Sequence, residues 1–276
     1  MPVLDAHTHL FPPEIIEKRE RIASDDRAFG IIYGGRKARM ADGQQLSGYL
    51  EKEGIDVVVA CGFPFRDPGL VRLTNDYMLE TARADRRIVP FAIIDPAHET
   101  TSIREAERCL ERGARGIGEI AYYGGGFGES ERRALNALAT WMEQAGMVLM
   151  LHVNEQVGHA YQGKTAVDFG EIIRFLEDHP SLKIILAHMG GGICFYEFMP
   201  EIRKSFSLVY YDLAAVPFLY SEAIYSFAAQ FLSHKVLFGS DYPLLPYSRY
   251  KSALERLDRE ARERILYDNG KELLGL

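Results

Sequence analysis

Eight short apolar stretches rich in β-branched residues alternate along the chain with segments of helical apolar spacing, and this alternation most constrains the fold. The eight predicted strands span residues 3–7, 55–61, 88–94, 115–120, 147–152, 183–188, 207–213 and 235–239. Strands that are apolar on both faces are typical of a parallel sheet covered by helices. The pattern therefore predicts an α/β fold.

The segments between these strands carry the helical period. The clearest predicted helices span residues 70–85, 103–113, 130–146, 168–179 and 221–234. Ser130 is a candidate N-cap, and Gly113 and Gly146 follow helical runs where a left-handed residue is often needed. The length of 276 residues fits one α/β barrel, so we predict a single domain over residues 1–276. An open doubly wound sheet is the rival architecture.

Metal-capable side chains occur at or near the ends of the first, fourth, fifth, sixth and last predicted strands: His7, His9, Glu119, His152, His188 and Asp241. Because side chains alternate along a strand, His7 and His9 point to one side, as two ligands of one ion must, and Asp5 is expected there too. Only a closed ring brings the first strand beside the last. The pattern favours a distorted (β/α)8 TIM barrel, with its active site at the C-terminal strand ends.

The longest stretch without a predicted element runs from about residue 11 to residue 43. We interpret it as a loop, either a solvated surface excursion or a lid that offers Arg36 to an acidic substrate. Four further residues directly follow strands and are candidates for contacting a substrate, although packing within loops explains them equally well: Phe63, Tyr122, Tyr123 and Asn154.

Charge and cysteine content limit the class of protein. The formal net charge of −7 opposes general binding to nucleic acid or anionic lipid, so a small-molecule substrate is expected. The three cysteines are odd in number and lack C-x-x-C spacing, which argues against a disulfide framework and indicates a reducing compartment. With no signal segment or apolar run long enough to span a bilayer, a cytoplasmic enzyme is predicted. A homodimer is suggested only by analogy with other barrels.

Several segments together resemble the amidohydrolase superfamily: DAHTHLFP near the start, LHVNE at 151–155, ILAHMGGG at 185–192, FGSDYP at 238–243 and the closing RILYDNGKELLGL. They are most similar to the amidohydrolase-2 group, also called amidohydrolase-related. That group also contains metal-dependent non-oxidative decarboxylases. The segments span nearly the whole chain, and they are specific for superfamily and fold but not for substrate.

The resemblance implies a metal site. His7, His9, His152 and Asp241 would bind a divalent metal, expected to be Zn²⁺ with Mn²⁺ as the alternative, and His188 would be a second-metal ligand or an acid and base. Glu119 stands where many superfamily members have a carboxylated lysine, and its segment resembles the TatD-type deoxyribonucleases. One-ion and two-ion sites both remain open.

The resemblance favours a hydrolase that uses metal-activated water to cleave a C–N or C–O bond, as in an amide or lactone. Asp241 would accept the proton of that water, while His188 stabilises negative charge on the substrate oxygen. The alternative is a non-oxidative decarboxylase of an aromatic or unsaturated carboxylic acid. A TatD-type nuclease and an inactive binding barrel are less favoured.

Overall fold

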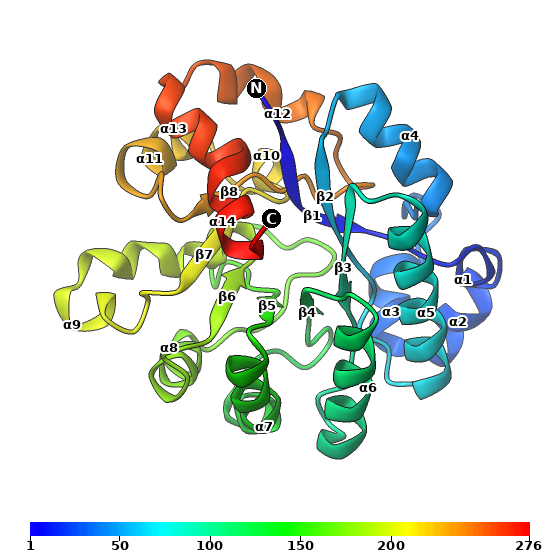
Figure 1. Cartoon of the computed structure of the whole chain (residues 1–276). Helices are drawn as coiled ribbons and strands as arrows, with labels where there is room; N and C mark the ends of the chain where they lie inside the picture. Colours follow the sequence, from blue (N-terminus) through cyan, green and yellow to red (C-terminus); the bar gives the residue numbers. More distant parts are fainter.

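The computed structural model describes residues 1–276 and contains one sheet of eight parallel strands in sequential order, surrounded by helices (Figure 1). The strands are β1 Leu4–His9, β2 Val57–Cys61, β3 Ile88–Ala92, β4 Gly116–Ile120, β5 Val148–Leu151, β6 Lys183–Leu186, β7 Val209–Asp212 and β8 Val236–Leu237. All eight lie within a few residues of their predicted positions. The predicted (β/α)8 barrel is confirmed, and the open sheet is excluded.

Backbone hydrogen bonds between β1 and the segment around β8 close the ring. The amide of Ala6 donates to the carbonyl of Phe238 at 2.8 Å, and the amide of His9 donates to that of Tyr242 at 2.7 Å. The amide of Asp241 donates to the carbonyl of His7 at 2.9 Å. The first and last metal-capable segments therefore lie side by side, although more than 200 residues separate them in sequence.

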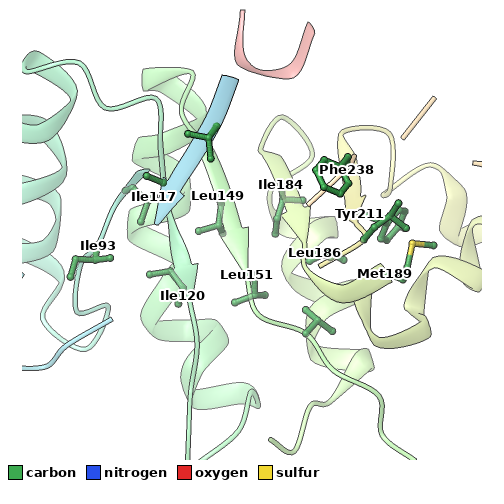
Figure 2. Packing of buried hydrophobic residues seen from close by; sticks show 14 of the residues in the cluster. Ile93, Ile117, Ile120, Leu149, Leu151, Ile184, Leu186, Met189, Tyr211 and Phe238 are labelled. Atoms are coloured by element: carbon green, nitrogen blue, oxygen red, sulfur yellow. The ribbon is translucent and has the colours of Figure 1, made fainter. Parts of the chain in front are cut away.

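The apolar side chains form two layers of core, which explains why the strands are apolar on both faces. A cluster of 12 buried residues includes Leu4, Val59, Phe91 and Met150 from the strands and two leucines of the last helix. The larger cluster of 64 buried residues joins the other faces of the strands to the surrounding helices, as Figure 2 shows around β4 to β8. Side chains that alternate between the two clusters fix which residues at each strand end enter the barrel.

The helices and turns follow in chain order: α1 Pro13–Glu17, α2 Arg19–Asp25, α3 Arg27–Tyr33, α4 Gly43–Glu53, α5 Pro68–Ala84, α6 Glu99–Glu111, α7 Glu129–Ala145, α8 Phe169–Asp178, η1 His188–Phe198, α9 Pro200–Arg203, α10 Val216–Leu219, α11 Ala223–Phe231, α12 Ser248–Glu255, α13 Arg259–Glu263, η2 Arg264–Asp268 and α14 Asn269–Leu274. The five predicted helices are confirmed. Gly146 ends α7 with φ 67°, as expected. The predicted cap Ser130 is wrong, because α7 begins earlier: Gly128 is its N-cap, and the amide of Gly128 donates to Glu131.

The stretch from residue 11 to residue 43 is not the loop that we expected. It contains α1, α2 and α3, which bury Ile15, Ile22 and Phe29 at intervals of seven residues. Each of the three helices thus buries an apolar side chain in the core, and this packing stabilises helices that are too short to persist alone. None of the helices of the chain has the length and apolar character needed to cross a membrane.

Candidate metal centre

The six predicted metal-capable side chains meet at the C-terminal ends of the strands as two groups. The first, which we call the β1–β8 triad, consists of His7, His9 and Asp241, and the second, the β4–β6 triad, consists of Glu119, His152 and His188. Within each triad the ligand atoms lie within 4.8 Å of one another. Closure of the barrel positions the first triad, while three consecutive parallel strands position the second.

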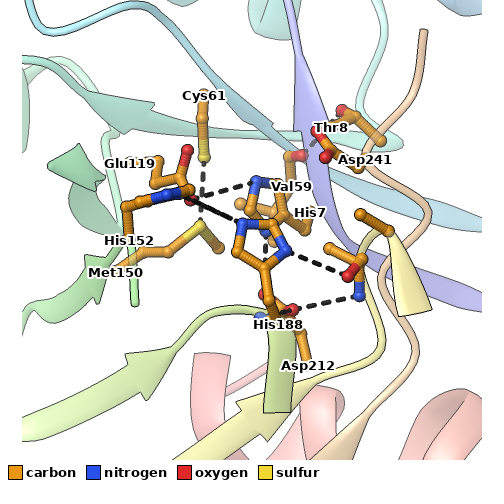
Figure 3. Close-up of polar contacts among 12 residues, drawn as sticks. His7, Thr8, Val59, Cys61, Glu119, Met150, His152, His188, Asp212 and Asp241 are labelled. Atoms are coloured by element: carbon orange, nitrogen blue, oxygen red, sulfur yellow. Dashed lines mark hydrogen bonds and ion pairs between the residues drawn. The ribbon is translucent and has the colours of Figure 1, made fainter. Parts of the chain in front are cut away.

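Glu119 lies between the two triads and faces both. Its Oε1 lies 3.0 Å from Nδ1 of His152 and 3.4 Å from Nε2 of His188 (Figure 3). The same oxygen lies 3.8 Å from Nε2 of His7, and Oε2 lies 3.8 Å from Nε2 of His9. One carboxylate thus contacts the donor atoms of both groups, as a shared or bridging ligand would.

Hydrogen bonds fix which nitrogen of two imidazoles faces the centre. Nδ1 of His7 donates to Oδ2 of Asp212 at 2.8 Å, and Nδ1 of His188 donates to the carbonyl of Ala214 at 2.9 Å. In a neutral ring the other nitrogen, Nε2, then carries a lone pair. Both lone pairs face the carboxylate of Glu119, and such acceptors repel one another unless a proton or a cation lies between them.

The distances between the donor atoms, and the lack of hydrogen-bond partners for two buried nitrogens, fit a bound divalent ion. Two ligand atoms bound at about 2.0–2.2 Å to one ion lie roughly 3–3.6 Å apart. Nε2 of His9 lies 3.3 Å from Nε2 of His7 and 3.2 Å from Oδ1 of Asp241. Nδ1 of His9 and Nε2 of His152 are buried without a hydrogen-bond partner, which costs about 1–3 kcal/mol each unless a ligand or its water supplies one. Imidazoles and carboxylates are good ligands for Zn²⁺ and Mn²⁺.

The buried carboxylates give the centre a strong attraction for positive charge. Burial opposes protonation of His7, but Asp212, Glu119 and Asp241 together raise its pKa to about 10. Burial also opposes protonation of His188, but its pKa is raised to about 9, mainly by Glu119. Burial likewise opposes ionisation of Glu119, but the histidines hold its pKa well below the usual value. Protons on the imidazoles balance the carboxylates in the protein alone, and a bound cation would replace them.

Two of the six side chains stand on left-handed backbone, which residues other than glycine seldom adopt. His188 has φ 57° and Asp241 has φ 62°. The amide of His188 donates to Oδ1 of Asp212 at 2.7 Å and so helps to hold this conformation. The glycines after His188 form a tight turn: a Cβ on Gly191 would lie 2.3 Å from the backbone of Asn154. Such local strain, about 1–3 kcal/mol per residue, is common at functional sites.

Two further carboxylates support the centre, and the sequence analysis did not assign either role. Asp212 accepts hydrogen bonds from His7 and from the backbone of His188, so it orients one candidate ligand in each triad.

The side chain of Asp5 does not lie on the same side of β1 as the rings of His7 and His9, and the expectation that it would is wrong. The register of β1 against β2 shifts between Asp5 and Thr8, which breaks the alternation. The carboxylate of Asp5 instead accepts hydrogen bonds from Tyr49, from Ser240 and from the amide, not the ring, of His7, and burial raises its pKa to about 6.

Aromatic side chains form a wall next to the β4–β6 triad. The ring centroid of Tyr123 lies 5.2 Å from that of His152, and Phe63 stacks on Tyr123 at 5.8 Å. Tyr33, at the end of α3, packs edge to face on Phe63 with centroids 5.8 Å apart. Phe63 and Tyr123 were candidates from the sequence. Tyr33 was missed because it lies in the stretch interpreted as a loop.

The structure does not bring the other substrate candidates to the donor atoms. The ring of Tyr122 packs against Phe127, and its pKa is raised by burial and by acids outside the two triads. Both amide hydrogens of Asn154 donate to backbone carbonyls, and its oxygen accepts from Thr165, so this side chain braces the loop after β5. Arg36 is exposed in a turn after α3. A substrate contact by any of the three stays a prediction.

Comparison with known proteins identifies the family. The sequence model of the amidohydrolase family matches residues 4–276, nearly the whole chain. The chain belongs to the amidohydrolase family. This confirms the resemblance found in the sequence segments. No curated protein matches this amidohydrolase-family chain.

Solved structures resemble this member of the amidohydrolase family over their full length. The 5-carboxyvanillate decarboxylase of Sphingomonas paucimobilis has a TM-score of 0.80 at 16% identity, covering 100% of this chain and 99% of that one. The enzyme of the same name from Novosphingobium aromaticivorans DSM 12444, complexed with manganese and 4-hydroxy-3-methoxy-5-nitrobenzoic acid, has 0.79 at 16%, covering 100% and 96%. The dihydroxybenzoic acid decarboxylase of Polaromonas sp. JS666, with manganese and 2-nitroresorcinol bound, has 0.73 at 16%, covering 100% and 97%. At these identities the likeness establishes the fold.

Proposed function

We propose that this chain is a metal-dependent non-oxidative decarboxylase that acts on an oxygen-substituted aromatic acid. The observation that carries the proposal is the group of Tyr33, Phe63 and Tyr123 beside the six donor side chains, because it puts aromatic rings, against which a substrate ring would pack, next to the candidate cation site. The three solved structures described above are decarboxylases of aromatic acids, which supports the same choice. It replaces the hydrolase that we favoured from the sequence.

The side chains of both triads would hold the ion, with Glu119 as the ligand that they share. A bound divalent ion supplies a Lewis acid that stabilises negative charge on substrate oxygens. We expect Mn²⁺ or Zn²⁺, since both accept nitrogen and carboxylate ligands. Asp212 fixes the imidazole of His7 through its hydrogen bond to Nδ1, and it therefore controls which nitrogen faces the ion.

Asp241 is placed to move the proton that the reaction needs. Its side chain is 15% exposed, whereas that of Glu119 is 4% exposed, so Asp241 is the acid that an incoming substrate can reach. Replacement of a carboxylate by hydrogen takes up one proton and releases carbon dioxide. Asp241, whose carboxylate is ionised when no substrate is bound, would take up this proton from solvent once the substrate is in place and deliver it to the ring carbon that bears the carboxylate. The bond between that carbon and the carboxylate then breaks, its electron pair stays with the ring, and Asp241 is ionised again.

Tyr33 and Tyr123 would orient the substrate. Neither hydroxyl has a hydrogen-bond partner in the protein, whereas those of Tyr49 and Tyr250 are both paired. Burial raises the pKa of Tyr33 well above its usual value, and Asp241 and Glu119 raise it further. Burial, Glu119 and Tyr33 act in the same direction on Tyr123. Both groups therefore stay protonated at neutral pH and are donors for a carboxylate or a ring oxygen of the substrate.

The reaction is tested with the protein reconstituted in Mn²⁺ or Zn²⁺ and a panel of hydroxylated and methoxylated benzoic acids labelled with ¹³C in the carboxyl group. We expect labelled carbon dioxide in amounts equal to the decarboxylated product. In deuterium oxide the product should carry one deuterium at the vacated carbon. Absence of carbon dioxide release from the entire panel with either metal would contradict the assignment.

A hydrolase is the second candidate, and one observation favours it. Although burial opposes ionisation of Asp241, a hydrogen bond from His9 and the nearby histidines lower its pKa, so it is ionised at neutral pH. An ionised carboxylate suits a base that accepts a proton from attacking water. The same reconstituted protein is given amides and lactones in ¹⁸O-labelled water. Incorporation of the label into a carboxylate product, without carbon dioxide release, would select the hydrolase.

A further inference from the structure

A cavity of about 770 Å³ lies between the short helices α1–α3 and the start of α5, and we call it the α3–α5 cavity. Figure 1 shows these helices next to α5 on one side of the barrel. None of the six donor side chains of the metal centre lines the cavity. Its volume is within the range of about 300–1,000 Å³ that is typical of sites for small molecules. The reaction proposed above gives this cavity no role.

One part of the lining of the cavity is apolar. Ile15 of α1 and Ile22 of α2 border it on one side, and Leu70 of α5 borders it on the other. The loop between β4 and α7 contributes Tyr123 and Gly125. A Cβ placed on Gly125 would have no heavy atom within 4 Å, so this loop leaves the space open. Such a lining suits a ligand that has an apolar portion.

Two arginines of the lining have no partner within the chain. Arg27 is the first residue of α3, and Arg66 lies just before α5. Both are exposed, and neither guanidinium makes an ion pair or a hydrogen bond. Nε of Arg27 would lie 4.0 Å from a Cβ placed on Gly124, so this side chain extends to the loop between β4 and α7. The two arginines thus present free donors at opposite parts of the sequence to one cavity.

The acids of the lining, in contrast, already have partners. Ion pairs within one helix join two of them to the two other cations of the lining: Glu14 with Lys18, and Asp25 with Arg21. Asp26 and Asp67 are the N-caps of α3 and α5, and each accepts a hydrogen bond from a backbone amide of its helix. The positive end of a helix dipole also offsets part of the charge of an N-cap acid. The two unpaired arginines are therefore the charged groups left to bind a ligand.

We infer that the α3–α5 cavity is a second ligand site, which binds a small organic acid. Arg27 and Arg66 would hold its carboxylate, and the apolar chain or ring of the acid would pack against Ile15, Ile22 and Leu70. A guanidinium offers a carboxylate two parallel N–H donors, and such charge-assisted hydrogen bonds are stronger than neutral ones. Phosphate also suits arginine, but the apolar part of the lining favours an organic acid over the inorganic anion.

Tyr123 connects this site to the metal centre. It lines the cavity, and its ring centroid lies 5.2 Å from that of His152. A ligand in the cavity and a molecule bound at the metal centre would therefore both contact Tyr123. The site does not depend on the proposed reaction, because binding of the acid uses none of the donor side chains of the two triads.

The test uses octanoate, which combines one carboxylate with an apolar chain, and measures its dissociation constant on the purified full chain by isothermal titration calorimetry. Octanamide has the same chain without the charge and should bind at least about 10-fold more weakly. Arg27→Gln and Arg66→Gln, made singly, should each raise the dissociation constant of octanoate about 10-fold. Because both side chains are exposed, neither substitution should lower the midpoint of thermal unfolding.

Arg86→Gln is the matched control, because Arg86 is also exposed but does not line the cavity, and it should leave the dissociation constant unchanged. The chain with and without bound metal should bind octanoate equally well, since the cavity contains none of the six donors. Loss of binding on removal of the metal would place octanoate on the ion and overturn the inference. Absence of octanoate binding, or wild-type affinity in both Arg27→Gln and Arg66→Gln, would overturn it as well.

Discussion

The two triads of the metal centre are built in different ways, although each contributes three side chains. The β1–β8 triad depends on closure of the barrel, since the amide of Asp241 donates to the carbonyl of His7. The β4–β6 triad comes from three consecutive strands, and its side chains are 4–8% exposed. In the β1–β8 triad, His7 is fully buried, but His9 and Asp241 are 12% and 15% exposed. In the proposed reaction, the substrate would therefore approach from the side of His9 and Asp241.

The difference in exposure suggests that some side chains of the centre bind the ion and others transfer protons. Deep side chains with fixed imidazole orientations are suited to hold an ion, because little reorganisation is needed when it binds. A more open carboxylate can exchange protons with substrate and solvent. Glu119 belongs to the deep group but contacts both, so it should matter most to ion binding, whereas Asp241 should matter most to the reaction.

The largest effect is expected from Glu119→Gln, which keeps the shape of the side chain and removes its charge. Loss of this ligand leaves the lone pairs of His7 and His188 without the carboxylate that they share with the ion. Metal affinity should fall at least about 100-fold and activity should be lost. Metal content by mass spectrometry and titration against a chelator measure this. Glu129→Gln, at an exposed position on α7, is the control. Full metal occupancy in Glu119→Gln would remove Glu119 from the centre.

The substitution Asp241→Asn should separate proton transfer from ion binding. The amide cannot deliver a proton, so kcat should fall about 100- to 10,000-fold. Metal affinity should fall less than in Glu119→Gln, because the deep triad is intact. Both quantities are measured on the same preparations. If the loss of metal binding in Asp241→Asn equals that in Glu119→Gln, the triads do not differ in function and the comparison fails.

Most of the fold could be predicted from sequence, because parallel strands buried on both faces must be apolar throughout, and such short apolar runs between helical segments locate them. The positions of the candidate ligands followed from the strand ends, since all parallel strands end on the same face of a barrel. Asp5 shows where this reasoning stops. The prediction assumed that side chains alternate without interruption along β1. The register of β1 against β2 shifts between Asp5 and Thr8, and no local pattern of residues indicates this shift.

The sequence analysis also missed Asp212 and Tyr33, for different physical reasons. Asp212 ends β7 in the run VYYD, so its position after a buried strand was a usable signal, but one acid at a strand end does not reveal which histidine it orients. Tyr33 lies in short helices that persist because they pack on the barrel. With five to seven residues each, these helices are too short to show a helical period, and charged residues and glycine interrupt the apolar pattern.

Asp212→Asn tests whether the two triads share one support. The asparagine oxygen can still accept one hydrogen bond, but it cannot neutralise or orient His7 as a carboxylate does. Removal of a residue that orients a metal ligand typically lowers metal affinity about 10- to 100-fold, and we expect a decrease in this range. Zn²⁺ and Mn²⁺ titrations of the purified variant give the value. An unchanged affinity would show that the bond between His7 and Asp212 does not prepare the site.

Tyr33→Phe should have the smallest effect, and it tests whether the open side of the centre also recognises the substrate. The change removes one hydroxyl and keeps the ring that packs against Phe63. Loss of one hydrogen bond of about 1–1.5 kcal/mol should raise KM or the dissociation constant of a hydroxybenzoate roughly 5- to 10-fold, while metal affinity stays the same. Tyr210→Phe is the matched control, because Glu272 of α14 is the charged group that affects Tyr210 and neither triad does, so substrate binding should not change. Equal effects of the two substitutions on hydroxybenzoate binding would deny Tyr33 a specific contact, even if decarboxylation itself were demonstrated.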